Sequence, residues 1–334
     1  MFAPGFSVFV VNDMNMQPSG QGWDVHLDVR QQLRGTSVMH RQVPLDITFV
    51  GPDWQRTATS AVMDGPATEV DVHVPFEPRM VELNGYNRLT QARMDHEFVV
   101  RNGQSFITIL PHVDFQLFAD SIVDSALVRI EHIWAGPDRM LGAGVTELSS
   151  SHYWVVDGIW PEGTRFRGRV NYEGALATDL DNDLYGVTEE NAVLVYRATP
   201  LDPWTIYPDQ TWSGNILTNG VGNFTMTRLR KGQYAFAKRD PFAGVGELDG
   251  TAGLKVFPVP ARDAVTICGR GAAGEAIYEV RDAEGRLQLM AGGTFGEGTC
   301  KRLDVSMLAA GEHLVAVRNA AGTVIGRARF TVQQ

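Results

Sequence analysis

Apolar and polar residues alternate over short stretches along almost the whole chain. A period of two places successive side chains on opposite faces of an extended strand, so this pattern predicts strands rather than helices. Only residues 187–191 and 306–309 look like single helical turns. Because strands and turn residues follow one another at regular spacing, we expect an all-β fold of serial Ig-like β-sandwiches. The predicted strands cover residues 6–11, 23–29, 44–50, 68–74, 105–110, 126–134, 165–172, 192–198, 223–229, 233–237, 264–268, 276–282, 313–319 and 327–332.

Two interruptions of this pattern suggest the domain boundaries. The alternation breaks around residues 89–96, and residues 239–253 are rich in glycine and polar residues, which is typical of a linker. We therefore predict a first sandwich over residues 1–92, a second over 93–240, a linker over 241–253 and a small domain over 254–334.

Composition excludes several classes of protein. Among the 334 residues, 44% are hydrophobic and 20% are charged, which is typical of a folded globular chain. No apolar run approaches the roughly 18 residues that a transmembrane helix needs. The net charge is −10, and it is uneven: the last 81 residues carry 10 basic and 8 acidic residues, whereas the first 253 carry 19 basic and 31 acidic ones. Because an acidic surface repels phosphate groups, we do not expect a nucleic-acid partner.

No catalytic motif is recognisable. A zinc protease of the HExxH type needs a second histidine four residues after the first, but the nearest match, at His96-Glu97, has Val100 there. The eight histidines are scattered singly, so we expect surface or packing roles for them. Ser149 to Ser151, with His152 and Asp157, could form a hydrolase triad only with a nucleophile elbow, which is lacking. We predict that the chain itself is not an enzyme.

A literal GxGxxG occurs at residues 269–274. This fingerprint binds a dinucleotide only where it opens a helix, because the helix N-terminus holds the pyrophosphate. Here a predicted strand follows, so we expect a glycine-rich hairpin loop.

Four acidic residues have spacing that resembles a calcium-binding loop. Asp179, Asp181, Asp183 and Glu190 stand at positions 1, 3, 5 and 12 of such a loop, and carboxylate oxygens at this spacing can wrap Ca²⁺. Position 6 is Leu184 rather than glycine. The alternative is an Asp- and Asn-rich turn without a metal. Calcium is the one cofactor that the sequence suggests.

Five tryptophans fall within the predicted second sandwich: Trp134, Trp154, Trp160, Trp204 and Trp212. If their rings were exposed in one flat patch, they could stack on sugars or hold a protein partner. If they were buried, they would serve as core packing. The chain could thus be a surface glycan- or protein-binding module.

The only two cysteines, Cys268 and Cys300, lie in the small last domain. Antiparallel pairing of their strands could place them opposite each other. An even number of cysteines in one small domain suits a disulfide in an oxidising compartment. The alternative is a pair of buried free thiols.

The last domain resembles the type A C-terminal sorting domain of the type IX secretion system. Four segments carry the resemblance: 255–267, 278–287, 303–317 and 327–334. They correspond to the family's PNPA strand, its Y-x-D-x-x-G-(K/R) hairpin, its L-x-x-G-x-Y strand and its terminal strand. Val259 replaces the usual asparagine and His313 the usual tyrosine. The motif residues are Pro258, Pro260, Asp282, Gly285, Leu308 and Gly311.

This resemblance implies export to the outer-membrane surface or the medium of a Gram-negative bacterium, with the type IX machinery as partner. Cargo of that system also carries an N-terminal signal peptide. Residues 1–15 lack the positive segment and the cleavage site of such a peptide. We therefore expect the chain to be the C-terminal part of a longer precursor.

Residues 1–240 resemble, more loosely, the region that follows the catalytic domain in secreted gluzincin zinc aminopeptidases of the alanyl-aminopeptidase type. The resemblance rests on segments such as 43–50, 125–138 and 152–174. In that family the zinc ligands lie upstream, so no catalytic residue is carried over. The resemblance implies an accessory role beside a missing catalytic domain.

Overall fold

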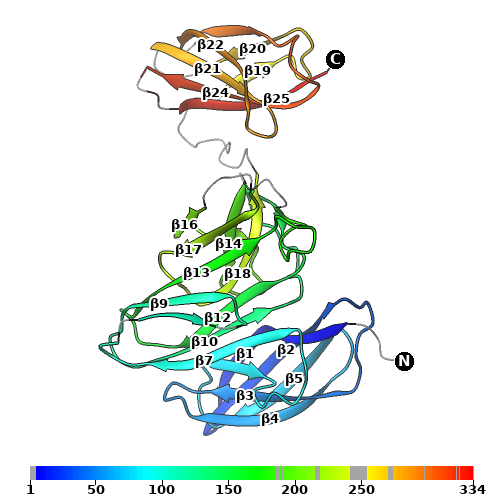
Figure 1. Ribbon diagram of the computed structural model, residues 1–334, viewed down its shortest axis with the longest axis vertical. Coiled ribbons are helices and arrows are strands. Elements are labelled where there is room, and N and C mark those ends of the chain that lie inside the picture. The colour runs from blue at the N-terminus through cyan, green and yellow to red at the C-terminus, as the bar shows by residue number, and fades with distance from the viewer. Residues whose placement is uncertain are drawn as a thin grey trace. The chain divides into compact units, whose positions relative to one another are not determined.

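The computed structural model of the chain describes residues 5–104, 106–110, 112–185, 189, 191–214, 219–240, 254–269, 274–296, 298–320, 322 and 324–333. Every regular element within those residues is a β-strand, which confirms the all-β prediction (Figure 1). The same residues hold no helix long and apolar enough to cross a membrane. The chain forms two compact units, Met1–Arg239 and Asp240–Gln334.

The first sandwich consists of two three-stranded antiparallel sheets with strand orders β1–β2–β5 and β4–β3–β6. Inward residues of the two sheets, such as Leu27, Ile47 and Phe49, are fully buried in a shared core. Buried residues alternate with more accessible ones along β2, which matches the period of two in its sequence. The strands are β1 (Phe6–Ser19), β2 (Gly22–Arg34), β3 (Val43–Val50), β4 (Arg56–Met63), β5 (Ala67–Val74) and β6 (Met80–Leu83).

The second sandwich packs a sheet of order β15–β14–β18–β12–β10–β7, with β11 also paired to β18, against a sheet of order β16–β17–β13–β9–β8. Its core is rich in aromatic rings, including Trp154, Tyr172 and Phe236. The strands are β7 (Arg93–Val100), β8 (Phe106–Leu110), β9 (Phe115–Ser121), β10 (Ala126–Ile133), β11 (Val145–Leu148), β12 (Tyr153–Ile159), β13 (Arg165–Glu173), β14 (Ala192–Arg197), β15 (Thr205–Ile206), β16 (Gln210–Ser213), β17 (Val221–Met226) and β18 (Gly232–Arg239).

The two sandwiches share a packed junction, which explains why they form one unit. Val8 of β1 is buried in a cluster with residues of the second sandwich, among them Tyr153. Arg56 of β4 binds Glu82 of β6 at 2.7 Å and reaches Glu97 of β7 at 2.5 Å. Such a shared apolar and ionic surface is what holds neighbouring sandwiches in one compact body.

The second unit is a smaller sandwich of sheets β19–β20–β23 and β22–β21–β24–β25 (Figure 1). Its core is mostly aliphatic, with Val265, Val280 and Val315 fully buried. The strands are β19 (Lys255–Phe257), β20 (Ala264–Cys268), β21 (Gly274–Arg281), β22 (Leu287–Phe295), β23 (Cys300–Asp304), β24 (Gly311–Asn319) and β25 (Val324–Val332). The predicted linker 241–253 lies outside the described residues.

Two local expectations were wrong. The glycine-rich segment 269–274 joins β20 to β21, which lie in different sheets, so it is not a hairpin loop but a connection between sheets; its residues 270–273 are outside the described part. Residues 306–309 form a turn closed by a bond from the Leu308 amide to the Val305 carbonyl, not a helical turn.

Candidate functional site

The first sorting motif lies between β19 and β20. Pro258 and Pro260 are exposed, whereas the following Ala261 is fully buried. The Ala261 amide donates to the carbonyl of Thr331 at 2.7 Å, and its carbonyl accepts from the amide of Gln333 at 2.8 Å. The proline segment is therefore tied to the last strand of the same unit.

The second motif forms the turn between β21 and β22. An oxygen of the Asp282 carboxylate accepts hydrogen bonds from the backbone amides of Glu284 at 3.1 Å and Arg286 at 2.8 Å. Gly285 has a φ of +82°, a conformation that glycine adopts at no steric cost. The spacing from Asp282 to Gly285 is thus what this turn requires.

The third motif leads into β24. Leu308 is buried in the core of the unit, and Gly311 begins the strand with a φ of +143°. His313, at the family's tyrosine position, is buried; its Nε2 lies 2.9 Å from the Ala309 carbonyl, and its ring lies against Phe330. All six motif residues therefore shape one compact unit.

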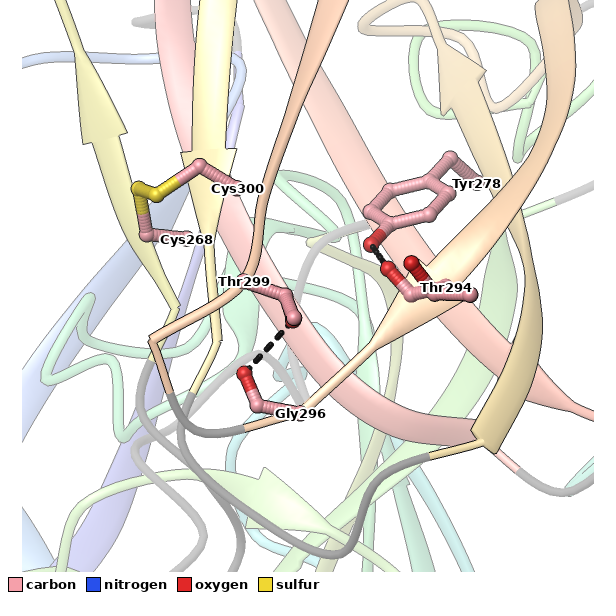
Figure 2. The surroundings of a disulfide bond; sticks show 6 residues. All are labelled: Cys268, Tyr278, Thr294, Gly296, Thr299 and Cys300. Atoms are coloured by element: carbon pink, nitrogen blue, oxygen red, sulfur yellow. Dashed lines mark hydrogen bonds between the residues drawn. A yellow bond between two sulfur atoms is a disulfide. The ribbon is translucent and has the colours of Figure 1, made fainter.

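The two cysteines form a disulfide, which Figure 2 shows with its surroundings. Cys268 of β20 and Cys300 of β23 are directly opposite each other in the antiparallel pair, with Cα atoms 4.1 Å apart. Nearby, the Thr299 hydroxyl donates to the Gly296 carbonyl at 2.7 Å, which fixes the chain that leads into β23. The bridge thus fastens neighbouring strands of one sheet.

The acidic residues proposed for calcium make separate contacts. Asp179 accepts from the Leu176 amide at 2.7 Å, and Asp183 accepts from the Ser150 hydroxyl. Asp181 contacts a histidine, as described below, and Glu190 lies outside the described residues. Within the described part of the chain, no three His, Cys, Asp or Glu side chains are arranged to hold a metal ion. This geometry resembles the alternative, a turn without a metal.

The tryptophans do not form a flat exposed patch in the described part of the chain. Trp154 and Trp204 are fully buried, and the partly buried Trp160 and Trp212 pack against the core. Trp134 is also only partly exposed and packs against a second buried cluster. These rings therefore act as core and rim packing, and no sugar platform is evident among them.

A buried polar cluster lies inside the second sandwich, and the sequence did not predict it. His132 of β10 and His152, which precedes β12, are almost wholly inaccessible to solvent. The Nε2 atom of His132 lies 2.7 Å from Nδ1 of His152, and Nε2 of His152 lies 2.8 Å from Oδ1 of Asp181. The other oxygen of Asp181 accepts from the Glu173 amide at 3.0 Å. Two imidazoles and a carboxylate thus form a continuous hydrogen-bonded chain.

The chain has a fourth member at its outer end. Nδ1 of His132 lies 3.4 Å from Oδ2 of Asp114, a residue just before β9 whose side chain is 55% exposed. This separation is too long for a good hydrogen bond, and Nδ1 has no hydrogen-bond partner. Trp134 and Trp154 stack on the His132 ring, with centroids at 4.6 and 4.7 Å.

Burial sets the protonation of His132. Desolvation lowers the pKa of His132 to about 4, although Asp114 acts in the opposite direction. His132 is therefore neutral at pH 7, and its contact with Asp114 is not an ion pair. The proximity of His132 in turn lowers the pKa of Asp114, so that carboxylate is ionised.

A cavity of about 440 Å³ opens beside this cluster. Its walls include the four cluster residues and aromatic rings, and no lysine or arginine is among the described lining residues. The lining residues are Ile109, Leu110, His112, Asp114, Phe115, Gln116, His132, Trp134, His152, Trp154, Asn171, Glu173, Leu180 and Asp181. The cavity therefore favours a cation or a neutral polar ligand over an anion.

Two further His–Asp pairs lie on the outer face of the first sandwich. His26 lies opposite Asp71, and Asp24 lies opposite His73, across the β2–β5 pair. Each Nδ1–Oδ1 distance is 2.8 Å. The bond to Asp71 raises the pKa of His26, and the bond to His73 lowers the pKa of Asp24. The shift of His26 is thus opposite in direction to that of His132.

Comparison with known proteins gives a distant structural likeness. No protein-family model matches the chain, and no curated protein matches it. The crystal structure of dimeric latent PorU from Porphyromonas gingivalis is similar over 98% of this chain and 34% of that chain, with 12% sequence identity and a TM-score of 0.21. This chain thus spans about a third of that one. A likeness at this identity and TM-score carries no argument about function.

Proposed function

We propose that the chain is the non-catalytic, export-addressing part of a longer protein secreted by a Gram-negative bacterium. The C-terminal unit is the signal that the type IX secretion machinery recognises, and the two preceding sandwiches are accessory. The observation that carries this proposal is that all six residues of the sorting motifs fall within one compact unit.

Two features of that unit support the proposal. Each motif residue has a position that determines the folded shape: an exposed proline segment, an Asp–Gly turn, a core leucine and a strand start. Secretion machinery that recognises a folded domain requires a domain of defined shape. The Cys268–Cys300 disulfide also suits an oxidising compartment outside the cytoplasm.

Secretion of the whole chain tests this proposal. The chain, fused to an N-terminal signal peptide that delivers it to the periplasm, is expressed in a bacterium that has the type IX system. We expect it at the cell surface or in the medium. We expect it in the periplasm when the translocon gene is deleted.

A truncated chain ending at Arg239 is the matched control, because it keeps the first unit intact. It should stay in the periplasm of both strains while remaining folded, as judged by protease resistance. Secretion of the truncated chain, or retention of the full chain in the strain with an intact translocon, would refute the proposal.

The parent protein is, in this proposal, a gluzincin zinc aminopeptidase whose catalytic domain precedes residue 1. The support is the resemblance of residues 1–240 to the post-catalytic region of that family. An HExxH motif in the upstream reading frame is expected. The chain alone should not hydrolyse aminoacyl-anilides, with or without added Zn²⁺, and turnover by the purified chain would contradict the accessory role.

A further inference from the structure

A second cavity lies where the two sandwiches of the first unit meet. Its volume is about 550 Å³, within the range of about 300–1,000 Å³ that is typical of small-molecule sites. Three of its residues, His112, Asp114 and Trp134, also line the cavity beside the histidine cluster. Unlike that cavity, this one has two arginines in its wall, Arg34 and Arg93.

Backbone hydrogen bonds fix one wall of this cavity. The Ala92 amide donates to the Ser7 carbonyl of β1 at 3.0 Å, and the Trp134 amide donates to the Ala92 carbonyl at 2.8 Å. Ala92 thus joins a strand of the first sandwich to the residue that follows β10 in the second. Because these bonds belong to the junction itself, the wall is in place before any ligand binds.

Arg34, at the end of β2, is held so that part of its guanidinium group is available to a ligand. Its Nη1 donates to the Trp134 carbonyl at 3.0 Å and lies 3.5 Å from the Ser151 carbonyl, and its Cζ lies 5.3 Å from the centre of the Trp134 ring. Among the described residues, Nε and Nη2 have no hydrogen-bond partner, and no carboxylate forms an ion pair with Arg34. These two nitrogens carry parallel N–H groups, which bind a carboxylate through both of its oxygens.

The second arginine of the wall has its partners within the protein. Nη1 of Arg93 lies 3.3 Å from Oε1 of Glu131, and its Nη2 donates to the Leu83 carbonyl at 2.8 Å. Arg93 is also buried, whereas Arg34 is half-buried. Arg34 is therefore the arginine that a ligand in the cavity would contact.

The wall beside Arg34 includes accessible apolar side chains. Phe6 lies opposite Arg34 in the β1–β2 pair and is 51% exposed, and Met94 of β7 is 41% exposed. The partly exposed ring of Trp134 extends this surface. Covering such side chains with an apolar group is favourable because it removes their surface from water. The cavity thus combines one cationic donor with an apolar surface.

We propose that this cavity binds a small monocarboxylic acid with an apolar body. Its carboxylate contacts Nε and Nη2 of Arg34, and its apolar body covers Phe6 and Met94. The Asp114 carboxylate, whose side chain is 55% exposed, lines the same cavity and disfavours a second negative group on the ligand. The site lies outside the sorting unit and does not depend on the proposed function.

Calorimetric titration of the full-length chain with octanoate, octanol, octylammonium and octanedioate tests the site. Octanoate should bind with a Kd below about 1 mM and at least about tenfold more tightly than octanol or octylammonium, because only a carboxylate accepts both N–H groups of Arg34. Octanedioate should bind more weakly than octanoate because its second carboxylate meets Asp114. Absence of octanoate binding, or equal binding of any of the other three compounds, would overturn the proposal.

Arg34→Gln is the informative variant, because it removes the charged donor and leaves the apolar surface. It should lower octanoate affinity by at least about tenfold and leave octanol affinity unchanged. Arg30→Gln is the matched control: Arg30 lies on the same strand and pairs with Asp28 at 3.4 Å, and it is not among the described residues that line this cavity. It should bind octanoate as the unaltered chain does.

A second variant covers the case in which Arg34→Gln disturbs the fold, since that substitution also removes a bond to a backbone carbonyl. Met94→Glu alters an exposed side chain and should therefore fold, which its melting temperature checks. The new carboxylate repels the ligand's own, so octanoate affinity should again fall by at least about tenfold. Unchanged octanoate affinity in a folded Arg34→Gln or Met94→Glu chain, or an equal loss in Arg30→Gln, would refute the assignment.

Discussion

The second sandwich and the C-terminal sandwich are both all-β, but they are stabilised differently. Among its described residues, the second sandwich buries nine aromatic side chains in its main core: Phe115, Trp154, Phe166, Tyr172, Tyr185, Tyr207, Phe224, Tyr234 and Phe236. The C-terminal sandwich buries three, Tyr278, Phe295 and Phe330, and adds a disulfide. Small domains bury a smaller fraction of their surface, so a covalent bridge makes a larger relative contribution there.

The two cores also differ in the polar groups that they enclose. A large aromatic core can enclose a histidine pair and a carboxylate because the hydrogen bonds among them offset the cost of burial. The C-terminal core encloses one histidine, His313, whose Nε2 contacts a backbone carbonyl. A larger core thus has more room for buried polar groups that folding does not require.

The largest expected effect is that of a cavity in the aromatic core. Phe236 is fully buried and contacts Trp154, His152 and Tyr172. Phe236→Ala should lower the free energy of unfolding of the first unit by about 3–5 kcal/mol. All seven tryptophans lie before residue 240, so tryptophan fluorescence during denaturation reports this unit. Phe330→Ala, in the C-terminal core, should leave that fluorescence transition in place; a shift would show that the units unfold together.

Loss of the disulfide should have the second-largest effect on stability. Cys268 and Cys300 are 32 residues apart, and closing a loop of that length stabilises a domain by about 2–4 kcal/mol. Calorimetry of the Cys268→Ser/Cys300→Ser chain should show a lower melting temperature for the C-terminal unit only. Reduction of the unaltered chain should reproduce the shift. An unchanged transition would mean that the aliphatic core suffices.

Acid should weaken the first unit through His132. The unfolded chain protonates this residue near pH 6.5, whereas the folded chain resists protonation down to about pH 4. The stability is therefore complete above pH 6.5 and is lost as the pH falls toward 4, by up to about 3 kcal/mol. Histidine NMR titration checks the cause: His26 should titrate above 6.5 and His132 far below it. Similar midpoints for both would contradict this account.

The smallest expected effects are those of two Asp→Asn substitutions, one at a buried carboxylate and one at an exposed carboxylate. Asp181→Asn leaves a buried donor without its partner and should cost about 1–3 kcal/mol of unfolding free energy. Asp71→Asn breaks an exposed pair and should leave the denaturation midpoint almost unchanged. Denaturation followed by tryptophan fluorescence measures both. Equal costs would mean that burial does not strengthen the hydrogen bonds that join His132, His152 and Asp181.

Sequence periodicity identified many of the strands, although it missed β4, β12 and β22, and it did not identify their partners. Alternation over residues 23–29 places Leu27 inward and His26 outward, as the structure has them. The same pattern predicted neither that the first two sandwiches would pack into one unit nor that β20 and β21 would lie in different sheets. Local alternation determines which face is buried, but it holds no information about what covers that face.

The histidine cluster shows the same limit at a site. Strand β10 pairs with β12 so that His132 lies opposite Trp154, which puts His152 on the neighbouring diagonal. Residues 134–152 separate these two strands in the sequence, so no local pattern links the two histidines. In the sequence, each histidine therefore appeared isolated, and Asp181 appeared to belong to a calcium-binding loop.

By itself, the sequence determined the class of fold, the turn chemistry of Asp282 and Gly285 and the small domain that holds both cysteines. These features depend on residues close together in the chain, where periodicity and backbone preference act directly. Only the tertiary structure decided that Cys268 faces Cys300, that Trp154 and Trp204 are buried, and that Asp114, His132, His152 and Asp181 meet. Contacts between distant segments depend on strand register and sheet packing, which no local pattern specifies.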